Sequence, residues 1–414
     1  MMEQILENQN RPAVLEKLYR SNKALFKRDF ATLYPQLQGS PSAEFWHERL
    51  NYESEEISWG SAREIGLVVI AALFAGLLAK LPTIFNIDQD IFYPRNLGFI
   101  VLPLLTAYFG WKSNLSVGKI AFAAIALLAG LVYINAMPFA AKADTLILSC
   151  IHLVIFEGCI LGFAYAGGAG FNEERRLGFL KYIADLVIMT GLILLAGALT
   201  SVITVGLFEL IGFNIKDFYF DNIAVMGLAA APILGTYLTQ TNPQLVGKIS
   251  PVIAKIFTPL VVVMLSAYLV AMIYSRNNPY NNREFLLMFN VLLVGVMALI
   301  FFSVAEGNKG KASGLQTWLL FTLSVLTIIV NSIALSAILF RITTGGFTAN
   351  RTAVLGGNLV ILANLLTVAF QLFRAATKRG DIAGVGKVIA AYLPVYFVWA
   401  IIVAFLFPLV FGVK

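Results

Sequence analysis

The chain has 414 residues, of which 59% are hydrophobic and 13% charged, and its formal net charge is +7. Soluble domains carry about 25% charged residues, so this composition excludes an ordinary soluble protein. The positive charge does not indicate a nucleic-acid partner, because basic residues gather at the edges of membrane spans for topological reasons.

Residues 1–62 are the only polar region long enough to form a soluble unit. Apolar residues recur there at three- and four-residue intervals, which is a helical period, and Pro35 precedes a Gly39-Ser40-Pro41 break. Two uses fit this small helical N-terminal region: a cap with its own core, or a basic helix lying on anionic headgroups. The number of apolar positions favours the cap, and a protein partner that binds residues 1–62 is a further use.

Eleven long apolar runs follow, and basic residues lie at or beyond their edges. A helix of about 20 apolar residues crosses the hydrocarbon core and satisfies its own backbone hydrogen bonds there. We therefore predict that residues 63–414 form an all-α, polytopic transmembrane helix bundle of about eleven spans. The predicted spans are 63–81, 97–111, 117–138, 145–166, 183–211, 223–240, 252–274, 285–305, 315–340, 353–373 and 387–411. The second is short and the fifth is long, which suggests tilt, a break or a partly re-entrant course.

The positive charges predict the orientation of the bundle. With the N-terminus inside, fifteen basic residues beyond residues 1–28 fall on the inner side and nine on the outer side. Cytoplasmic loops carry the excess of Lys and Arg, so we predict a cytoplasmic N-terminus. Eleven crossings then place the C-terminus outside.

Glu157 lies near the centre of the fourth predicted span. A charged side chain at that depth costs at least about 2.5–3.5 kcal/mol, so it must face the bundle interior, find a partner or carry a proton. Gly158 and Gly162 form a small-residue stripe on the same helix, which predicts close packing. Glu157 is the first candidate for a proton- or cation-coupling residue. The alternative is a protonated acid that hydrogen-bonds a neighbouring helix.

Four polar residues within the spans are secondary candidates. His152 lies five residues before Glu157, about 140° away around the helix, so the two do not form a dyad and a neutral, hydrogen-bonded histidine is the simpler interpretation. Asp185 lies about one turn inside the fifth span, as expected of a locally paired interfacial acid. Asn364 and Gln371 are seven residues apart and share a helix face, so they would line a cavity together, whereas interhelical hydrogen bonding is the alternative.

Asp88 and Asp90 form an acidic pair in the first predicted outer loop. Such pairs hold a metal or act as a base in lipid-linked glycosyltransferases, but a D-x-D string is a weak signal and the loop is short. The sequence has no HExxH zinc motif and no GxxxxGK[ST] phosphate loop. Its two cysteines, Cys150 and Cys159, lack the spacing of metal ligands or of a disulfide framework. We therefore predict no metal and no cofactor, and the sequence favours a non-enzymatic protein.

Two stretches resemble a known family: EKLYRSNKALFKRDFATLYPQLQGSPSAEFWHERLNYES near the N-terminus and SPVIAKIFTPLVVVMLSAYLVAMIYSRNNPYNNREFLLMFNVLLVG in the middle. They are similar to the DUF4153-type proteins, a bacterial integral-membrane family of unknown function. The resemblance covers most of the chain. It implies a bacterial inner-membrane location, and it assigns neither an activity nor functional residues.

Three functions fit the sequence. The first is a transporter or permease-like protein for a small molecule or ion, with Glu157 as the coupling carboxylate. The second is a non-catalytic scaffold or regulator that binds a protein through residues 1–62, and the third is a transferase that acts on a lipid-linked substrate through Asp88 and Asp90. A cavity reaching Glu157 would favour the first, and an exposed patch on residues 1–62 the second. A metal or pyrophosphate pocket near Asp90 would favour the third.

Overall fold

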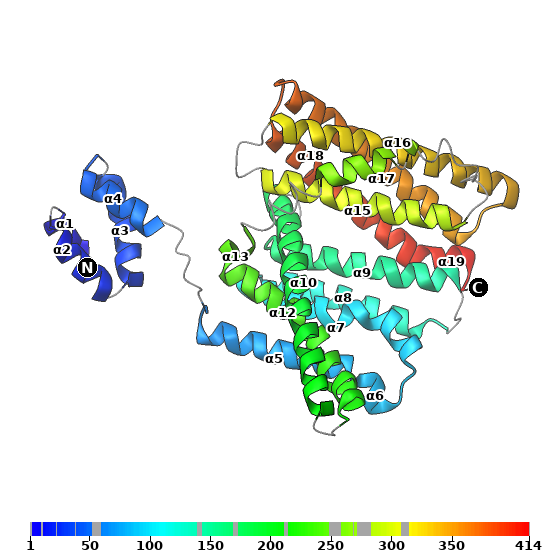
Figure 1. Ribbon diagram of the computed structural model, residues 1–414, viewed down its shortest axis with the longest axis horizontal. Helices are drawn as coiled ribbons and strands as arrows, with labels where there is room; N and C mark the ends of the chain where they lie inside the picture. The colour runs from blue at the N-terminus through cyan, green and yellow to red at the C-terminus, as the bar shows by residue number, and fades with distance from the viewer. Residues whose placement is uncertain are drawn as a thin grey trace. The chain divides into compact units, whose positions relative to one another are not determined.

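The computed structural model describes residues 2–9, 11–21, 23–37, 39–51, 59–138, 143–168, 173–210, 214–247, 258–267, 269–270, 283–307 and 314–413. Every regular element among these residues is helical, so the predicted all-α fold is confirmed. The contacts divide the chain into two compact units, Met1–Ser58 and Trp59–Lys414 (Figure 1). This division falls four residues before the predicted boundary at residue 62.

The N-terminal unit is a group of short helices around an aromatic core. Its helices are α1 Met2–Glu7, α2 Pro12–Ser21, α3 Lys23–Leu37 and α4 Pro41–Asn51. Trp46 is 2% exposed, and its ring centroid lies 5.1 Å from that of Phe26 and 5.6 Å from that of Tyr19. The apolar residues at helical spacing thus face one another, which is the core that the cap interpretation requires.

One charged group joins α2 and α4. Arg20 donates a hydrogen bond to Glu16 at 2.8 Å, and Arg49 forms an ion pair with Glu16 at 2.9 Å. The hydrogen bond from Arg20 lowers the pKa of Glu16 below its usual value. The Arg49 guanidinium also lies over the Trp46 ring, 4.9 Å from its centroid, and so covers the edge of the core.

The second unit is a bundle of longer helices. They are α5 Ala62–Ala79, α6 Leu81–Phe85, α7 Gln89–Lys112, α8 Val117–Ala136, α9 Asp144–Tyr165, α10 Glu173–Leu210, α11 Lys216–Phe218, the π-helix η1 Tyr219–Ala224, α12 Val225–Thr241, α13 Pro243–Gly247, α15 Arg283–Gly307, α16 Gly314–Gly345, α17 Ala349–Ala376, α18 Ile382–Ile401, the π-helix η2 Ile402–Leu406 and α19 Phe407–Phe411. A further apolar helix spans Thr258–Ala267.

Eight helices among the described residues are long and apolar enough to cross a membrane. Each coincides with one of the predicted spans, so a multi-pass membrane protein is confirmed. The other three predicted spans, 97–111, 252–274 and 285–305, fall on α7, on residues that are only partly described, and on α15. The total of eleven spans therefore stays a prediction.

Helix α7 begins eight residues before the predicted second span, which explains why that span looked short. The Asp88 side chain accepts a hydrogen bond from the backbone N–H of Asp90 at 2.8 Å and so caps the helix. Asn96 lowers the hydropathy of the first turns, but it is buried and exchanges hydrogen bonds of 3.1 and 2.8 Å with Asn135 of α8. Polar residues that satisfy each other between helices can lie inside a span.

Helix α9 lies at the centre of the unit and contacts α7, α8, α10, α17 and α18. Helices α7 and α9 run in parallel. Residues from the first turns of both helices line one groove, and the rings of Phe109 and Tyr165, near their last turns, lie 5.0 Å apart. The side chains between α7 and α9 therefore belong to one interface that follows the length of both helices.

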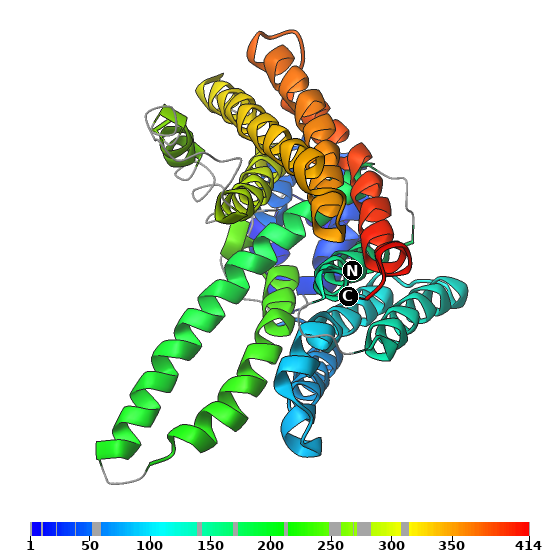
Figure 2. The ribbon, with the colours of Figure 1, turned by 90° about the vertical axis from the view of Figure 1, so that its right-hand side faces the viewer.

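Helix α10 connects two groups of helices, and in Figure 1 it is drawn vertically past one end of the horizontal α9. Tyr182 and Leu186 pack into the core shared by α5, α7, α9 and α12, whereas Leu177 packs against α15 and α18. The fifth predicted span falls on α10, which is a single continuous helix of 38 residues. Only 11% of the residues in an apolar stretch of 18 residues of α10 are buried. Figure 2 shows the α10–α12 hairpin in green extending away from the other helices.

The last span contains the π-helix η2, and a proline explains part of its hydrogen bonding. Pro408 has no N–H, so the carbonyl of Ala404 lacks the donor that a regular α-helix would supply. Ser149 of α9 donates to this carbonyl at 2.7 Å, and Tyr133 of α8 donates to the next one, Phe405, at 3.2 Å. Side chains of α8 and α9 thereby hold the end of the chain against the bundle.

Ser149→Ala is expected to destabilise the bundle by about 1 kcal/mol, because it removes the side-chain donor to the carbonyl of the buried Ala404. Unfolding of the purified protein in mixed micelles, followed by circular dichroism, measures this loss. Ser332→Ala is the matched control, since Ser332 is exposed and donates only within its own helix. Equal stability of the two variants would show that the Ser149 hydrogen bond contributes nothing.

Candidate functional site: a buried carboxylate between α7 and α9

The Glu157 side chain is enclosed in the bundle. Glu157 is 1% exposed, and its Oε2 atom has no hydrogen-bond partner among the described residues. No Lys, Arg or His in the described part of the chain forms an ion pair with it. An unpartnered acid is costly in a dry interior, so Glu157 is the most unusual polar group of the membrane unit.

Gly98 of α7 makes the space for the Glu157 carboxyl. A Cβ atom at Gly98 would lie 2.6 Å from Oε2 and 2.8 Å from Oε1, closer than real contacts allow. The depth of Glu157 in its span predicted this residue from the sequence, whereas Gly98 was not predicted, because only the packing of α7 on α9 brings the two residues together. The predicted glycine stripe of α9 is different: a Cβ at Gly158 would meet nothing within 4 Å, and Gly162 packs on the ring of Phe179.

A groove of about 330 Å³ opens on the same interface where α7 and α9 begin. Asp90 and Arg95 line it together with apolar side chains that include Leu97 and Val154. These two apolar residues lie one and three positions before Gly98 and Glu157 in the sequence. The residues that line the groove do not include Glu157 itself.

The acidic pair does not converge on one point. Asp88 caps α7, whereas Asp90 is exposed and lines the groove. Within the described ranges, no three His, Cys, Asp or Glu side chains are close enough together to hold a metal ion. The transferase hypothesis, which places both carboxylates at one substrate, stays a prediction.

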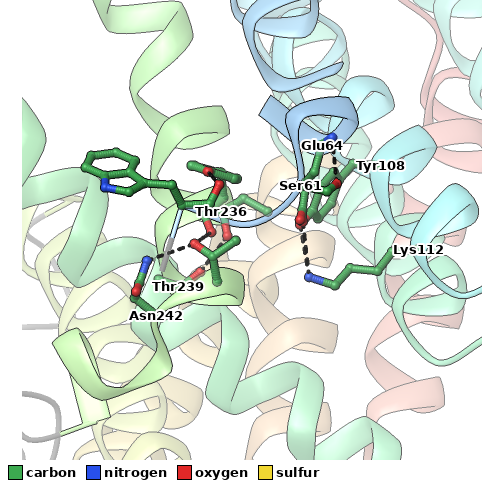
Figure 3. Close-up of polar contacts among 10 residues, drawn as sticks. Ser61, Glu64, Tyr108, Lys112, Thr236, Thr239 and Asn242 are labelled. Atoms are coloured by element: carbon green, nitrogen blue, oxygen red, sulfur yellow. Dashed lines mark hydrogen bonds and ion pairs between the residues drawn. The ribbon is translucent and has the colours of Figure 1, made fainter. Parts of the chain in front are cut away.

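A second polar cluster lies where α7 ends, and Figure 3 shows it. Tyr108 donates a hydrogen bond to Glu64 at 2.7 Å, and Lys112 lies 3.5 Å from the same carboxylate in an ion pair. Ser61 begins α5 by accepting a hydrogen bond from the backbone N–H of Glu64. Glu64 therefore ties the start of α5 to the end of α7. Glu64 was not predicted from the sequence, because an acid at the edge of a span resembles an interfacial charge.

Polar groups of α12 continue this cluster. The hydroxyls of Tyr182, on α10, and of Thr236 are buried and lie 2.8 Å apart. Thr239 donates to the Thr236 carbonyl at 2.9 Å (Figure 3). A second groove of about 330 Å³ lies beside them, lined by Arg63, Tyr108 and Thr236 among mainly apolar side chains. The cluster's polar groups have partners, so its geometry is that of a structural network.

The structure does not bring the secondary candidates to Glu157. The His152 ring bonds the Leu148 carbonyl at 2.9 Å, and Asp185 lies 3.6 Å from Lys181, which is the local pairing expected of it. No hydrogen bond or ion pair connects either of them to Glu157 in the described ranges.

Buried amides form a separate group among α16, α17 and α18. Asn364 donates to the Tyr396 hydroxyl at 2.9 Å, and Asn331 donates to the Asn358 carbonyl at 3.0 Å. Gln371, seven residues after Asn364, is half-buried. These contacts join neighbouring helices, which is the interhelical role that the sequence left open beside substrate contact.

No family model, no curated protein and no solved structure matches this chain. The similarity to DUF4153-type proteins therefore stays a prediction.

Proposed function

We propose that this multi-pass membrane protein is a transporter of a small solute or ion, and that Glu157 binds and releases the coupling proton. A single observation supports the proposal: Glu157 is fully buried at mid-helix, and its Oε2 atom has no hydrogen-bond partner among the described residues. Structural acids in membrane helices bond a neighbour, whereas acids in proton pathways must exchange their proton.

The α7–α9 seam suggests how protonation would be coupled to movement. A neutral carboxyl fits against the bare backbone of Gly98, but a carboxylate there would need water or a cation. Loss of the proton would therefore favour a state in which α7 and α9 separate and water enters. A transporter requires two such states with different affinities for its ligands.

We also propose that the protein lies in a bacterial inner membrane with its N-terminus in the cytoplasm, as predicted above. The groove at the start of α7 then opens on the outer side, and the Glu64 cluster lies on the inner side. Cysteine labelling with a membrane-impermeant reagent tests this, at Phe347 between α16 and α17 and at Asn114 after α7. Labelling of the first from outside and of the second only after lysis is the expected result.

Glu157→Gln is expected to lower proton-driven uptake by about tenfold or more, which equals about 1.4 kcal/mol, because glutamine keeps the shape but cannot release a proton. Membrane vesicles that contain the full chain are given a solute mixture with and without a proton gradient. Mass spectrometry identifies the solutes that enter only with the gradient, and the variant is then compared for those solutes.

Glu209→Gln is the matched control, because Glu209 is exposed in the last turn of α10. Its uptake should equal that of the unmodified protein. Unchanged uptake in Glu157→Gln vesicles would contradict the role of Glu157. If no solute enters beyond the level of vesicles without the protein, the transporter hypothesis itself is wrong.

A further inference from the structure

Two opposite charges line the groove at the start of α7 and α9, and they do not pair with each other. Arg95 is 8% exposed, and its contact in the described part of the chain is a weak hydrogen bond of 3.4 Å to the Pro138 carbonyl. No described carboxylate forms an ion pair with it, although Asp90 lines the same groove. A buried arginine without a counter-ion is costly in free energy, so an anionic group of a ligand in the groove would stabilise Arg95.

The walls of the groove are apolar and face outward. Leu97 is 65% exposed, Ile151 is 55% exposed and Val154 is 41% exposed, and all three line the groove. In a span these surfaces meet acyl chains, because the surrounding solvent is lipid. The groove therefore combines a place for a hydrocarbon chain with one positive and one negative group near its polar end.

We propose that this groove binds a phospholipid with a phosphoethanolamine headgroup. The phosphate pairs with the Arg95 guanidinium, whose fork of donors matches two phosphate oxygens. The primary ammonium donates to the Asp90 carboxylate, and an acyl chain lies along Leu97, Ile151 and Val154. The volume of about 330 Å³ is at the lower end of ligand pockets, which fits a headgroup and part of one chain.

Asp90 distinguishes this lipid from those with phosphoglycerol or phosphocholine headgroups. A phosphoglycerol headgroup has no ammonium to offset the negative charge of Asp90. A phosphocholine headgroup has an ammonium without N–H donors, so it cannot hydrogen-bond a carboxylate. The lipid site is independent of the proposed function, since none of these contacts requires Glu157 to exchange a proton.

Native mass spectrometry of the delipidated full chain in detergent tests the site. Phosphatidylethanolamine, phosphatidylglycerol and phosphatidylcholine with identical acyl chains are added separately, and the population of lipid-bound protein is measured. We expect phosphatidylethanolamine to bind about tenfold more tightly than the other two. Arg95→Gln should remove this binding, and Asp90→Asn should remove the preference over phosphatidylcholine while leaving binding itself.

Two further variants keep the test decisive. Leu97→Trp fills the groove without altering either charge and should also prevent binding, so the result does not depend on Arg95→Gln folding. Arg351→Gln, at an arginine in the first turn of α17, is the control and should bind as the unmodified protein does. Equal binding of the three lipids, or lipid binding that ignores Arg95, Asp90 and Leu97 alike, would overturn the proposal.

Discussion

Trp46→Ala is expected to unfold the N-terminal unit, with a loss of about 3–5 kcal/mol. Trp46 is among the largest fully enclosed side chains of the unit, and Phe26, Tyr19 and Arg49 all pack on its ring. A helical unit of this size has a total stability of about 3–5 kcal/mol, so the loss is comparable to the whole. Hydrogen exchange of the full-length protein, followed by mass spectrometry of peptides from residues 2–51, measures the effect.

Phe45 provides the control for this prediction. It precedes Trp46 on α4, but it is 60% exposed, so Phe45→Ala removes an aromatic ring without opening the core. Peptides of the N-terminal unit should lose their protection in Trp46→Ala and keep it in Phe45→Ala. Similar protection in both variants would mean that the aromatic core does not hold the unit together.

Gly98→Ala is expected to destabilise the membrane unit by about 1–3 kcal/mol, because a methyl group there overlaps the Glu157 carboxyl. The nearest neighbours of the new Cβ are both carboxyl oxygens, and the enclosed side chain has little room to move. Detergent-induced unfolding of the purified protein measures the change. Gly158→Ala is the control, because that position on α9 has open space for a methyl group.

A pair of double variants separates overlap from charge. Glu157→Ala removes the atoms that the new methyl group meets, so adding it to Gly98→Ala should recover about 0.5–3 kcal/mol. Glu157→Gln keeps a side chain of the same size, so adding it should recover nothing. If Gly98→Ala is as mild as Gly158→Ala, the seam is looser than the packing of Gly98 on Glu157 indicates.

The sequence was sufficient to predict eight of the long apolar helices and the buried position of Glu157. Apolar runs of span length can only be helical in lipid, and the run around Glu157 continues far enough on both sides to place it near mid-helix. A buried acid followed from this depth, and the structure places it at 1% exposure.

The partners of these residues could not be predicted, because they come from other helices. Gly98 lies 59 positions before Glu157, and nothing near it in the sequence indicates an acid. The start of α7 was missed for the same reason: Arg95 and Asn96 lower the local hydropathy, and only the pairing of Asn96 with Asn135 shows how the span accommodates them. A hydropathy scale scores each side chain alone, whereas in a helix bundle polar side chains from different helices satisfy one another's hydrogen bonds.

The π-helix η2 determines which face of α19 is turned toward the bundle. Its wide turn holds one more residue than a regular turn of helix, so it acts as a one-residue insertion in the last span. Each residue advances a helix by about 100°, so removing one residue from Ile402–Leu406 would rotate α19 by that amount. Phe407, now buried near Trp399, would then turn away from it. Related chains that differ in length by one residue here would therefore align in sequence and still differ in the face that their last turns present.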